Sequence, residues 1–496
     1  MSRSLQIELP NLAEDTLGFF RYKHLPSGKV VLTNEVGEFE LLSAEDFRAL
    51  LAGQVREELR PALSDKGFLR EGADWNAIAG RLARKKLFLS NGPHLHAVVT
   101  TLRCNQSCSY CHASRTDMDR VDTDMSIEVA KKVVDFAMQS PSPYINFEFQ
   151  GGEPTIRFDI IQFVVQYARE KNRYEKKTLD FSLVTNMTYM DEDKAEWLIA
   201  NDVLVCTSLD GPKDLHDANR GWAKSSGAFD TVMQWMAYFN RRYVELGRDP
   251  DLWHVDALMT TTRRSLDRWK EIIDLYVGLG IRNIHLRPLN PFGFATKTWK
   301  AIGYSMEEFM DFYVKSLDYI LELNHQGTQI MEGRAAVFLS KMLTPDSPLY
   351  VDIRSPIGSG TGQLAYSYDG RIYPSDEGRM VAGQGDEFFH IGDVDMPFED
   401  VVQHPTVKAI AVASIVDSLP GCSTCFNAPW CGVRPLHNYM QGGDLFGQRP
   451  NTPKCKQHMD IATLLLDKLA QDEDGRIERV FRRWTIHRPR HEAEEA

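Results

Sequence analysis

Seven of the eight cysteines in this 496-residue chain lie in two clusters. In the first cluster, CNQSCSYC, Cys104, Cys108 and Cys111 are separated by three residues and then by two. Three thiolates leave one iron of a 4Fe-4S cluster open, and that iron can chelate the amino and carboxylate groups of S-adenosylmethionine and pass it an electron. The spacing alone also allows a zinc site, or three cysteines without a function.

The second cluster is CSTCFNAPWC followed by a later cysteine, which gives the set Cys422, Cys425, Cys431 and Cys455. Four thiolates complete either a zinc site or a fully ligated 4Fe-4S cluster. A cluster whose irons are all ligated by protein has no open position for a substrate, so we expect a structural or electron-transfer role. The eighth cysteine, Cys206, lies among Val and Leu, and we expect it to be a buried apolar residue.

The residues between the two clusters must position this chemistry, and they alternate between strand and helix patterns. We expect strands that begin near His96 and at residues 145, 179, 202, 254 and 282, with helices such as 126–139 and 266–279 between them. Strands that alternate with helices form a parallel sheet. Six such units are too few for a closed eight-stranded barrel, so the pattern predicts an α/β fold with a partial (β/α)6 barrel.

The flanking residues have other patterns. Residues 1–92 combine short strands with helices, which suggests a small N-terminal α+β domain. We expect the barrel to span residues 93–300, and a helical linker to span residues 301–349. Residues 350–465 are rich in Gly, Pro and Cys, which suggests a loop-dominated domain, and residues 466–496 suggest a C-terminal helix and tail.

Composition excludes several classes of protein. The net charge of −12 argues against nucleic acid as a partner. No apolar run reaches the roughly eighteen residues that a membrane helix needs, and the N-terminus lacks the apolar core of an export signal. We therefore expect a cytoplasmic protein, in a reducing compartment where clustered thiols bind metal more often than they form disulfides.

Polar and glycine residues follow the predicted strands. GGEP, residues 151–154, ends the second strand, and its glycines allow a ligand to approach the backbone closely. Ser182 and Asn186 lie at the end of the third strand, where they can contact a ribose or a carboxylate or can form a plain turn.

The CxxxCxxC spacing, with Tyr110 before the third cysteine and GGEP downstream, resembles the radical SAM superfamily. The resemblance implies that S-adenosylmethionine is cleaved reductively to a 5′-deoxyadenosyl radical. It also implies cofactor contacts from Tyr110 and from Gly151, Gly152, Glu153 and Pro154. SLDGP (208–212), followed by His216 and Arg220, resembles the peptide-modifying branch. There Arg220 would pair with the cofactor carboxylate, or it is a surface arginine.

The second cysteine cluster resembles the SPASM domain of radical SAM peptide maturases, which commonly carries seven cysteines and two auxiliary clusters. Here Ser375 and Pro435 stand where that pattern has cysteines. The resemblance therefore implies one auxiliary 4Fe-4S cluster, ligated by Cys422, Cys425, Cys431 and Cys455. Asp376 matches an aspartate that is thought to accept a substrate proton in sulfatase-maturating enzymes, so it is a candidate catalytic base or a turn residue.

Longer stretches, such as KVVLTNEVGEFELLS and DIRSPIGSGTGQLAYSYDGRIYPSDEGRM, resemble the B-type radical SAM maturase of the His-Xaa-Ser peptide system. This resemblance implies hydrogen abstraction from a ribosomally synthesised precursor peptide with His-Xaa-Ser repeats. It implies as partners a second radical SAM maturase and an electron donor such as flavodoxin or ferredoxin. The N-terminal domain would bind the peptide by strand addition, or simply cap the barrel.

Two other functions remain open. One is an anaerobic sulfatase-maturase-type enzyme that forms formylglycine. The other is a non-catalytic iron–sulfur or zinc protein that binds peptides.

Overall fold

The computed structural model describes residues 16–221, 227–250, 252–345, 350–449 and 451–486. Its centre is a ten-stranded sheet in the order β10-β9-β8-β7-β6-β5-β4-β11-β12-β13. Six neighbouring strands run parallel: β4 (Leu95–Thr101), β5 (Tyr144–Gly151), β6 (Thr178–Thr185), β7 (Val203–Ser208), β8 (Asp256–Thr260) and β9 (Asn283–Arg287). They confirm the predicted α/β fold with a partial (β/α)6 barrel.

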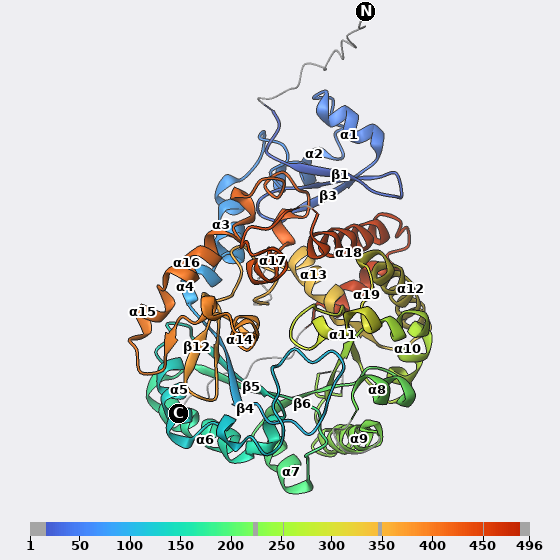
Figure 1. Ribbon diagram of the computed structural model, residues 1–496. Helices are drawn as coiled ribbons and strands as arrows, with labels where there is room; N and C mark the ends of the chain where they lie inside the picture. Colours follow the sequence, from blue (N-terminus) through green and yellow to red (C-terminus); the bar gives the residue numbers. More distant parts are fainter. Residues whose placement is uncertain (1–15, 222–226, 251, 346–349, 450, 487–496) are drawn as a thin grey trace, which may run out of the picture.

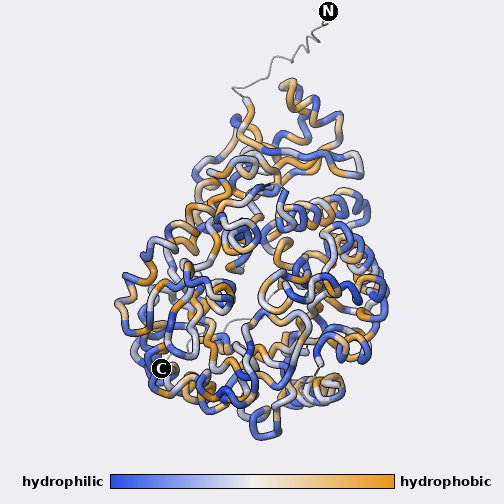
Figure 2. The backbone as a smooth tube through the Cα atoms, in the orientation of Figure 1, coloured by the Kyte–Doolittle hydropathy of each residue, from blue (hydrophilic) through white to orange (hydrophobic). Residues whose placement is uncertain are grey.

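Helices cover the outer face of this sheet (Figure 1). They are α5 (Ile127–Ala137), α6 (Phe158–Glu175), α7 (Glu192–Ala200), α8 (Lys213–Asn219), α9 (Phe229–Glu245) and α10 (Trp269–Gly278). The hydroxyl of Ser126 caps α5 and the carboxylate of Asp191 caps α7, each by accepting a backbone N–H of the first turn. Apolar and polar residues alternate along these helices (Figure 2), as expected for helices with one face on the sheet.

The two faces of the strands differ in polarity. In β5, Ile145, Phe147 and Phe149 are fully buried, whereas the residues between them, Asn146 and Glu148, are partly exposed. Strands of a parallel sheet are usually apolar on both faces because helices cover both. Here the inner face is polar, so it is available for chemistry.

Residues from the C-terminal part extend the sheet at both edges. β10 (Met331–Glu332) pairs with β9, and β11 (Gln363–Tyr366) lies parallel to β4 with Ala365 opposite Ala97. β12 (Arg371–Tyr373) and β13 (Gly392–Asp393) then continue antiparallel. The barrel sheet thus crosses the suggested boundary near residue 350, and the division into domains stays a proposal.

The N-terminal residues form a separate antiparallel sheet of β1 (Arg21–His24), β2 (Val30–Thr33) and β3 (Phe39–Leu42). The helices α1 (Ala44–Leu51), α2 (Arg60–Asp65), α3 (Trp75–Lys85) and α4 (Phe88–Asn91) follow it. Val30 and Leu32 pack with Phe47 and Phe68 in a small core of their own, whereas Val31 joins the main core.

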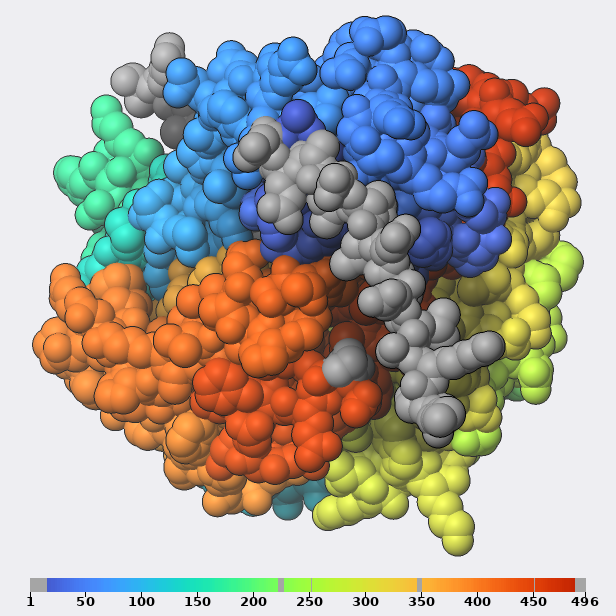
Figure 3. Space-filling view, turned by 90° about the horizontal axis from the view of Figure 1, so that it is seen from above, coloured from blue at the N-terminus to red at the C-terminus, as the bar shows by residue number. Residues whose placement is uncertain are grey.

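In Figure 1, most of the remaining helices lie between the N-terminal residues at the top and the barrel strands below. The remaining helices are α11 (Ala295–Ile302), α12 (Met306–His325), α13 (Gly333–Leu343), α14 (Asp376–Ala382), α15 (Phe398–Val402), α16 (Pro405–Val412), α17 (Pro435–Gly442), α18 (Pro453–Ala470) and α19 (Arg476–Trp484). Seen from above in Figure 3, the N-terminal residues lie directly against this C-terminal part. Among the described residues, no helix combines the length and apolar character needed to cross a membrane.

Candidate functional site

The loop with the first three cysteines follows β4, at the carboxyl ends of the parallel strands. Cys104 and Cys108 are buried and Cys111 is half-buried. The loop is tied down by backbone bonds on two sides, because Cys104 N donates to Thr116 O (3.1 Å) and Ser107 N donates to Gly221 O, just after α8 (2.8 Å). The three thiols are therefore held where ligands bind to open α/β sheets.

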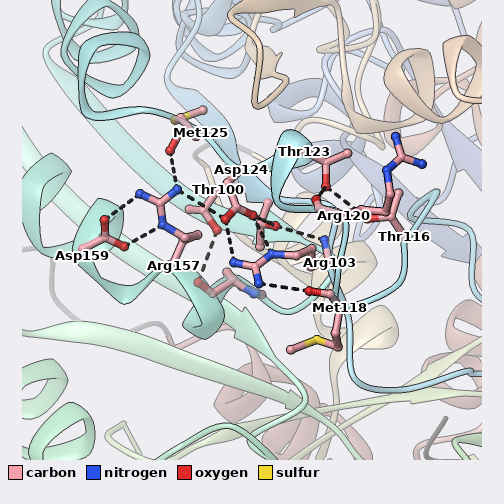
Figure 4. A network of polar contacts seen from close by, with 12 residues as sticks. Thr100, Arg103, Thr116, Met118, Arg120, Thr123, Asp124, Met125, Arg157 and Asp159 are labelled. Carbon is pink, nitrogen blue, oxygen red and sulfur yellow. Dashed lines mark hydrogen bonds and ion pairs between the residues drawn. The ribbon is translucent and has the colours of Figure 1, made fainter.

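A partly buried ion-pair network anchors the start of this loop (Figure 4). Arg103, the residue before Cys104, donates to both carboxylate oxygens of Asp124, at 2.8 and 2.6 Å. The hydroxyl of Thr101 donates to Asp124 Oδ1 (2.6 Å), and Arg157 lies 3.6 Å from Asp124 Oδ2. The sequence analysis missed Asp124, because nothing in its local pattern distinguishes it from the exposed aspartates around it.

The donors around the first thiol suit an iron–sulfur cluster. Cys104 Sγ accepts hydrogen bonds from Gln106 N (3.4 Å) and Asn186 Nδ2 (3.8 Å), and such bonds to sulfur tune these clusters. Burial raises the pKa of Cys104 to about 12 and of Cys108 to about 11. These thiols ionise when a metal centre supplies positive charge, so they fit a 4Fe-4S cluster chemically.

The two glycines of GGEP lie directly against the cysteine loop. Gly151 has φ +135°, and a Cβ on it would come within 2.1 Å of Thr101 O. Gly152 N donates to Thr101 O (2.9 Å), and a Cβ on Gly152 would come within 2.2 Å of Arg103 O. Glycine is required at both positions because the end of β5 and the residues before Cys104 approach each other so closely.

Glu153 has a structural role, because its carboxylate is occupied by hydrogen bonds within the protein. It is fully buried, and its carboxylate accepts hydrogen bonds from Thr155 N (3.0 Å), Thr155 Oγ1 (2.6 Å), Thr185 Oγ1 (2.7 Å) and Asn186 N (2.8 Å). Burial raises the pKa of Glu153. The side chain thus joins the end of β5 to the end of β6. The next residue, Pro154, is also buried, and its carbonyl accepts a hydrogen bond from the Thr100 hydroxyl (3.3 Å).

The two candidate residues of the third barrel strand, Ser182 and Asn186, lie in different surroundings. Asn186 directly follows β6, and its side chain bonds Cys104 Sγ and Asn105 Oδ1 (3.1 Å), so it lies in the cysteine loop. Ser182 lies within β6 instead of at its end, and its hydroxyl donates to Asn146 Oδ1 at 3.2 Å. Of these two residues, Asn186 is the one whose described contacts reach the loop of the first cluster.

Tyr110 and Arg220 form a buried network behind the third cysteine. Arg220 Nη1 donates to the Tyr110 hydroxyl (2.6 Å), which donates to the Asp210 carboxylate at 2.7 and 2.9 Å. Arg220 is 8% exposed, so it is not a surface arginine. Burial raises the pKa of Asp210, while the charge of Arg220 opposes that shift. Asp210 was missed, although an aspartate just after a strand, in SLDGP, marks a position at the sheet edge.

Titratable side chains line the inner face of the barrel. Burial raises the pKa of Glu148 on β5, the charge of Asp376 raises it further, and Arg287 on β9 opposes both. Cys206 on β7 is half-buried on this face, which differs from the buried apolar position expected. The alternation in INFEFQ could have revealed the polar face, since its polar residues recur at every second position.

Asp376 is the first residue of α14 and forms an ion pair with Arg379. Arg379 donates from Nε to Asp376 Oδ1 (2.9 Å) and from Nη1 to Ala113 O (3.2 Å), near the end of the first cysteine loop. Burial lowers the pKa of His112 to about 4, although the charge of Asp376 acts in the opposite direction. The candidate base therefore lies in a group of charges between α14, the inner face and the cysteine loop.

The second cluster lies between the N-terminal sheet and the first turn of α18. Its four cysteines are half-buried, and Cys431 Sγ lies 3.5 Å from His458 Nδ1. Burial raises the pKa of all four thiols, and the charges of Cys425 and Cys422 raise that of Cys455 further, to about 11. Within the described residues, no group of three or more His, Cys, Asp and Glu side chains is arranged to hold a metal ion. The four thiols fit a metal centre by chemistry, since metal binding would relieve their mutual repulsion.

Residues 98–302 match the Radical SAM superfamily. A cysteine-type anaerobic sulfatase-maturating enzyme of Clostridium novyi is 27% identical over 231 residues, which cover 44% of this chain and 61% of that enzyme.

Two solved structures are similar in fold. Native anSMEcpe with bound AdoMet and Cp18Cys peptide is 18% identical, with a TM-score of 0.63 over 79% of this chain and 100% of that chain. Streptococcus suis SuiB bound to precursor peptide SuiA is 15% identical, with a TM-score of 0.52 over 89% of this chain and 98% of that chain.

Proposed function

Since residues 98–302 form a radical SAM domain and the chain is thus a radical SAM enzyme, we propose that it modifies a ribosomally synthesised peptide by hydrogen abstraction. The observation that carries the proposal is the three-cysteine loop tied down beside GGEP at the carboxyl ends of the barrel strands. Cys104, Cys108 and Cys111 would hold a 4Fe-4S cluster. When bound, this cluster and S-adenosylmethionine supply a 5′-deoxyadenosyl radical.

The chain's own residues would hold S-adenosylmethionine in place. The backbone of Gly151 and Gly152 would meet its amino group, and the Asn186 side chain lies beside Cys104. Arg220 is nearly buried, and its Nε has no hydrogen-bond partner among the described residues, so it retains a donor for the cofactor carboxylate. Tyr110 would orient Arg220, because its hydroxyl accepts from that guanidinium.

A peptide substrate is supported by the two structures of similar fold, which hold a peptide and a precursor peptide. The polar inner face offers groups that would bind a peptide, namely Glu148 and Arg287 on the strands. Asp376 of α14, whose charge acts on Glu148, is the proposed base. His-Xaa-Ser repeats as the substrate motif, a second maturase as partner, flavodoxin or ferredoxin as electron donor and a cytoplasmic location are finer parts of the same proposal.

We also propose that Cys422, Cys425, Cys431 and Cys455 hold one auxiliary 4Fe-4S cluster. Its four irons would be ligated by protein, so its role is structural or in electron transfer. Both clusters are tested by measuring the iron and zinc contents of wild type and of a triple alanine variant after anaerobic reconstitution. Wild type should hold roughly eight irons, and alanine at Cys104, Cys108 and Cys111 should leave roughly four, since each cluster holds four. About four irons plus one zinc in wild type would refute the auxiliary cluster, and a triple variant that keeps all its iron would refute the radical site.

Formylglycine formation is the second candidate function. It is favoured by the similarity to a cysteine-type sulfatase-maturating enzyme and by Asp376 beside the inner face. Ser375 and Pro435, which replace two cysteines of the SPASM pattern, argue against it. Co-expression with a His-Xaa-Ser repeat peptide and, separately, with a sulfatase-derived peptide distinguishes the two, because only the true substrate changes mass. The third hypothesis, a non-catalytic binding protein, is set aside because the chain carries a radical SAM domain.

A further inference from the structure

A small cavity rich in cations lies where α3 and α4, α13 and the segment before β11 meet. Its volume is about 40 Å³, several times the roughly 10–15 Å³ that one water molecule needs. The charged side chains that line it are Lys85, Lys86, Lys341, Arg354, Glu35 and Asp417. Four cations therefore face two carboxylates, and one of these, Asp417, also lies 3.5 Å from Arg21.

Arg354 is the centre of this cavity. Its side chain is 3% exposed, and Nε, Nη1 and Nη2 have no hydrogen-bond partner among the residues that the structure describes. The guanidinium lies 4.5 Å from the centre of the Phe88 ring. It also packs so closely on Gly362 that a Cβ there would come within 1.7 Å of Nη2. The charge of Asp352 also acts on this guanidinium. A buried guanidinium whose donors have no hydrogen-bond partner among the described residues is still unfavourable, so the arrangement suggests a ligand that accepts its hydrogen bonds.

The neighbouring ammonium groups converge on the same space. Lys86 Nζ donates to Ser355 O (2.9 Å), and Lys341 Nζ donates to Ile353 O (2.6 Å), on the two sides of Arg354. An ammonium group carries three donors, so one carbonyl leaves donors for a ligand. Burial lowers the pKa of Lys341 to about 7. The charge of Cys431 opposes this shift, and repulsion from Lys86, Lys85 and Arg354 adds to it. A bound anion would relieve that repulsion.

We propose that this cavity is a binding site for an oxyanion, which Arg354, Lys86 and Lys341 would hold. The carboxylate of an acidic peptide residue and free phosphate share this chemistry. A larger pocket of about 410 Å³ on the N-terminal domain shares the lining residues Glu35 and Val36 with the cavity. An extended peptide in that pocket could therefore insert an acidic side chain. The peptide source rests on the proposed function, but the oxyanion site itself does not.

Calorimetry on the reconstituted enzyme tests the site without any assay of activity. Sodium phosphate and N-acetylglutamate N-methylamide are titrated separately, with ionic strength held constant by NaCl. At least one of them should bind with one-to-one stoichiometry. Arg354→Gln should weaken that binding by about tenfold or more, which corresponds to about 1.4 kcal/mol. Binding of phosphate alone would identify a free oxyanion as the ligand, and binding of the glutamate derivative would identify a peptide carboxylate.

Two further variants keep the test decisive. Lys86→Gln should also weaken binding, and it decides the matter if Arg354→Gln does not fold. Arg241→Gln is the matched control, because Arg241 is 61% exposed on α9 and pairs with Glu245 far along the chain from the cavity. Wild type that binds neither probe, or variants at Arg354 and Lys86 that bind as wild type does, would overturn the proposal. Failure of every peptide to be modified would leave this result unaffected.

Discussion

At the scale of single residues, Asp124 illustrates how one carboxylate supports the whole cysteine loop. It accepts a two-point interaction from Arg103 and a hydroxyl from Thr101, and the Arg103 and Asp124 side chains are 14% and 13% exposed. A two-point arginine–carboxylate pair with little exposure to water is among the stronger polar interactions in proteins. Its loss would release the residue that precedes the first cysteine.

We predict that Asp124→Asn lowers the free energy of unfolding by roughly 3 kcal/mol, because it breaks a mostly buried pair and leaves Arg103 without its counter-charge. The variant should also retain less iron in its first cluster after reconstitution. Urea unfolding and iron analysis measure the two effects. Asp122→Asn is the control, since Asp122 pairs with Arg120 on the surface, so its substitution should change neither quantity. Equal iron contents in the two variants would contradict the anchoring role.

At the scale of secondary-structure elements, β4 joins the barrel to the C-terminal part, because it pairs with β5 on one side and β11 on the other. His96 lies at this junction, fully buried, with Nδ1 2.8 Å from the Tyr366 hydroxyl of β11. The two rings stack with centroids 5.8 Å apart. Burial, with a smaller contribution from the charge of His94, lowers the pKa of His96 to about 3.

This shift predicts a loss of stability in acid. The pKa of His96 is lower in the folded than in the unfolded chain, so below pH 6.5 the unfolded chain takes up a proton that the folded chain does not. Stability should therefore be complete above the unfolded pKa and fall by about 1.4 kcal/mol per pH unit as the pH drops towards about 3. Between pH 7 and 5, wild type should lose about 2 kcal/mol more than His96→Gln.

Urea unfolding at pH 7, 6 and 5 measures this difference. His325→Gln is the matched control, because His325 is exposed at the end of α12 and its removal should leave the wild-type slope unchanged. If His96→Gln and wild type lost stability in parallel, His96 would not be the titrating group.

At the scale of the whole molecule, the N-terminal sheet packs directly on the loop of the second cysteine cluster. The Thr33 hydroxyl donates to Phe426 O (2.7 Å), and Trp430 Nε1 donates to Gly37 O (3.3 Å). Trp430 is fully buried, and Phe39 of β3 meets its ring edge-on at 5.8 Å. The proposed peptide-binding element and the proposed auxiliary cluster thus share one packed interface, so order in one supports order in the other.

We predict that Trp430→Ala destabilises the protein by about 3–5 kcal/mol, as expected when a large buried aromatic side chain is removed. Hydrogen exchange should rise most in residues 21–42 of the N-terminal sheet. Trp75→Ala is the control, because Trp75 is 50% exposed and should leave exchange in that sheet unchanged. Faster exchange spread evenly over the barrel strands, with none concentrated in the N-terminal sheet, would show that the two parts are not coupled through Trp430.

Features that depend on neighbours along the chain could be predicted from the amino-acid sequence. The cysteine spacings, the GGEP turn and the alternation of strand and helix are local patterns. The alternation predicted the six parallel strands, and the spacings indicate two sets of thiols as metal ligands, which stays a prediction. Features that depend on residues far apart in the chain became visible only in the folded protein. Among the described contacts, Asn186 reaches the cysteine loop whereas Ser182 does not, and the Glu153 carboxylate bonds the end of β6. The fold also pairs β11 with β4 and buries Arg354 among lysines of other elements. Burial and charge partners arise only when the chain is packed, and no local pattern encodes them.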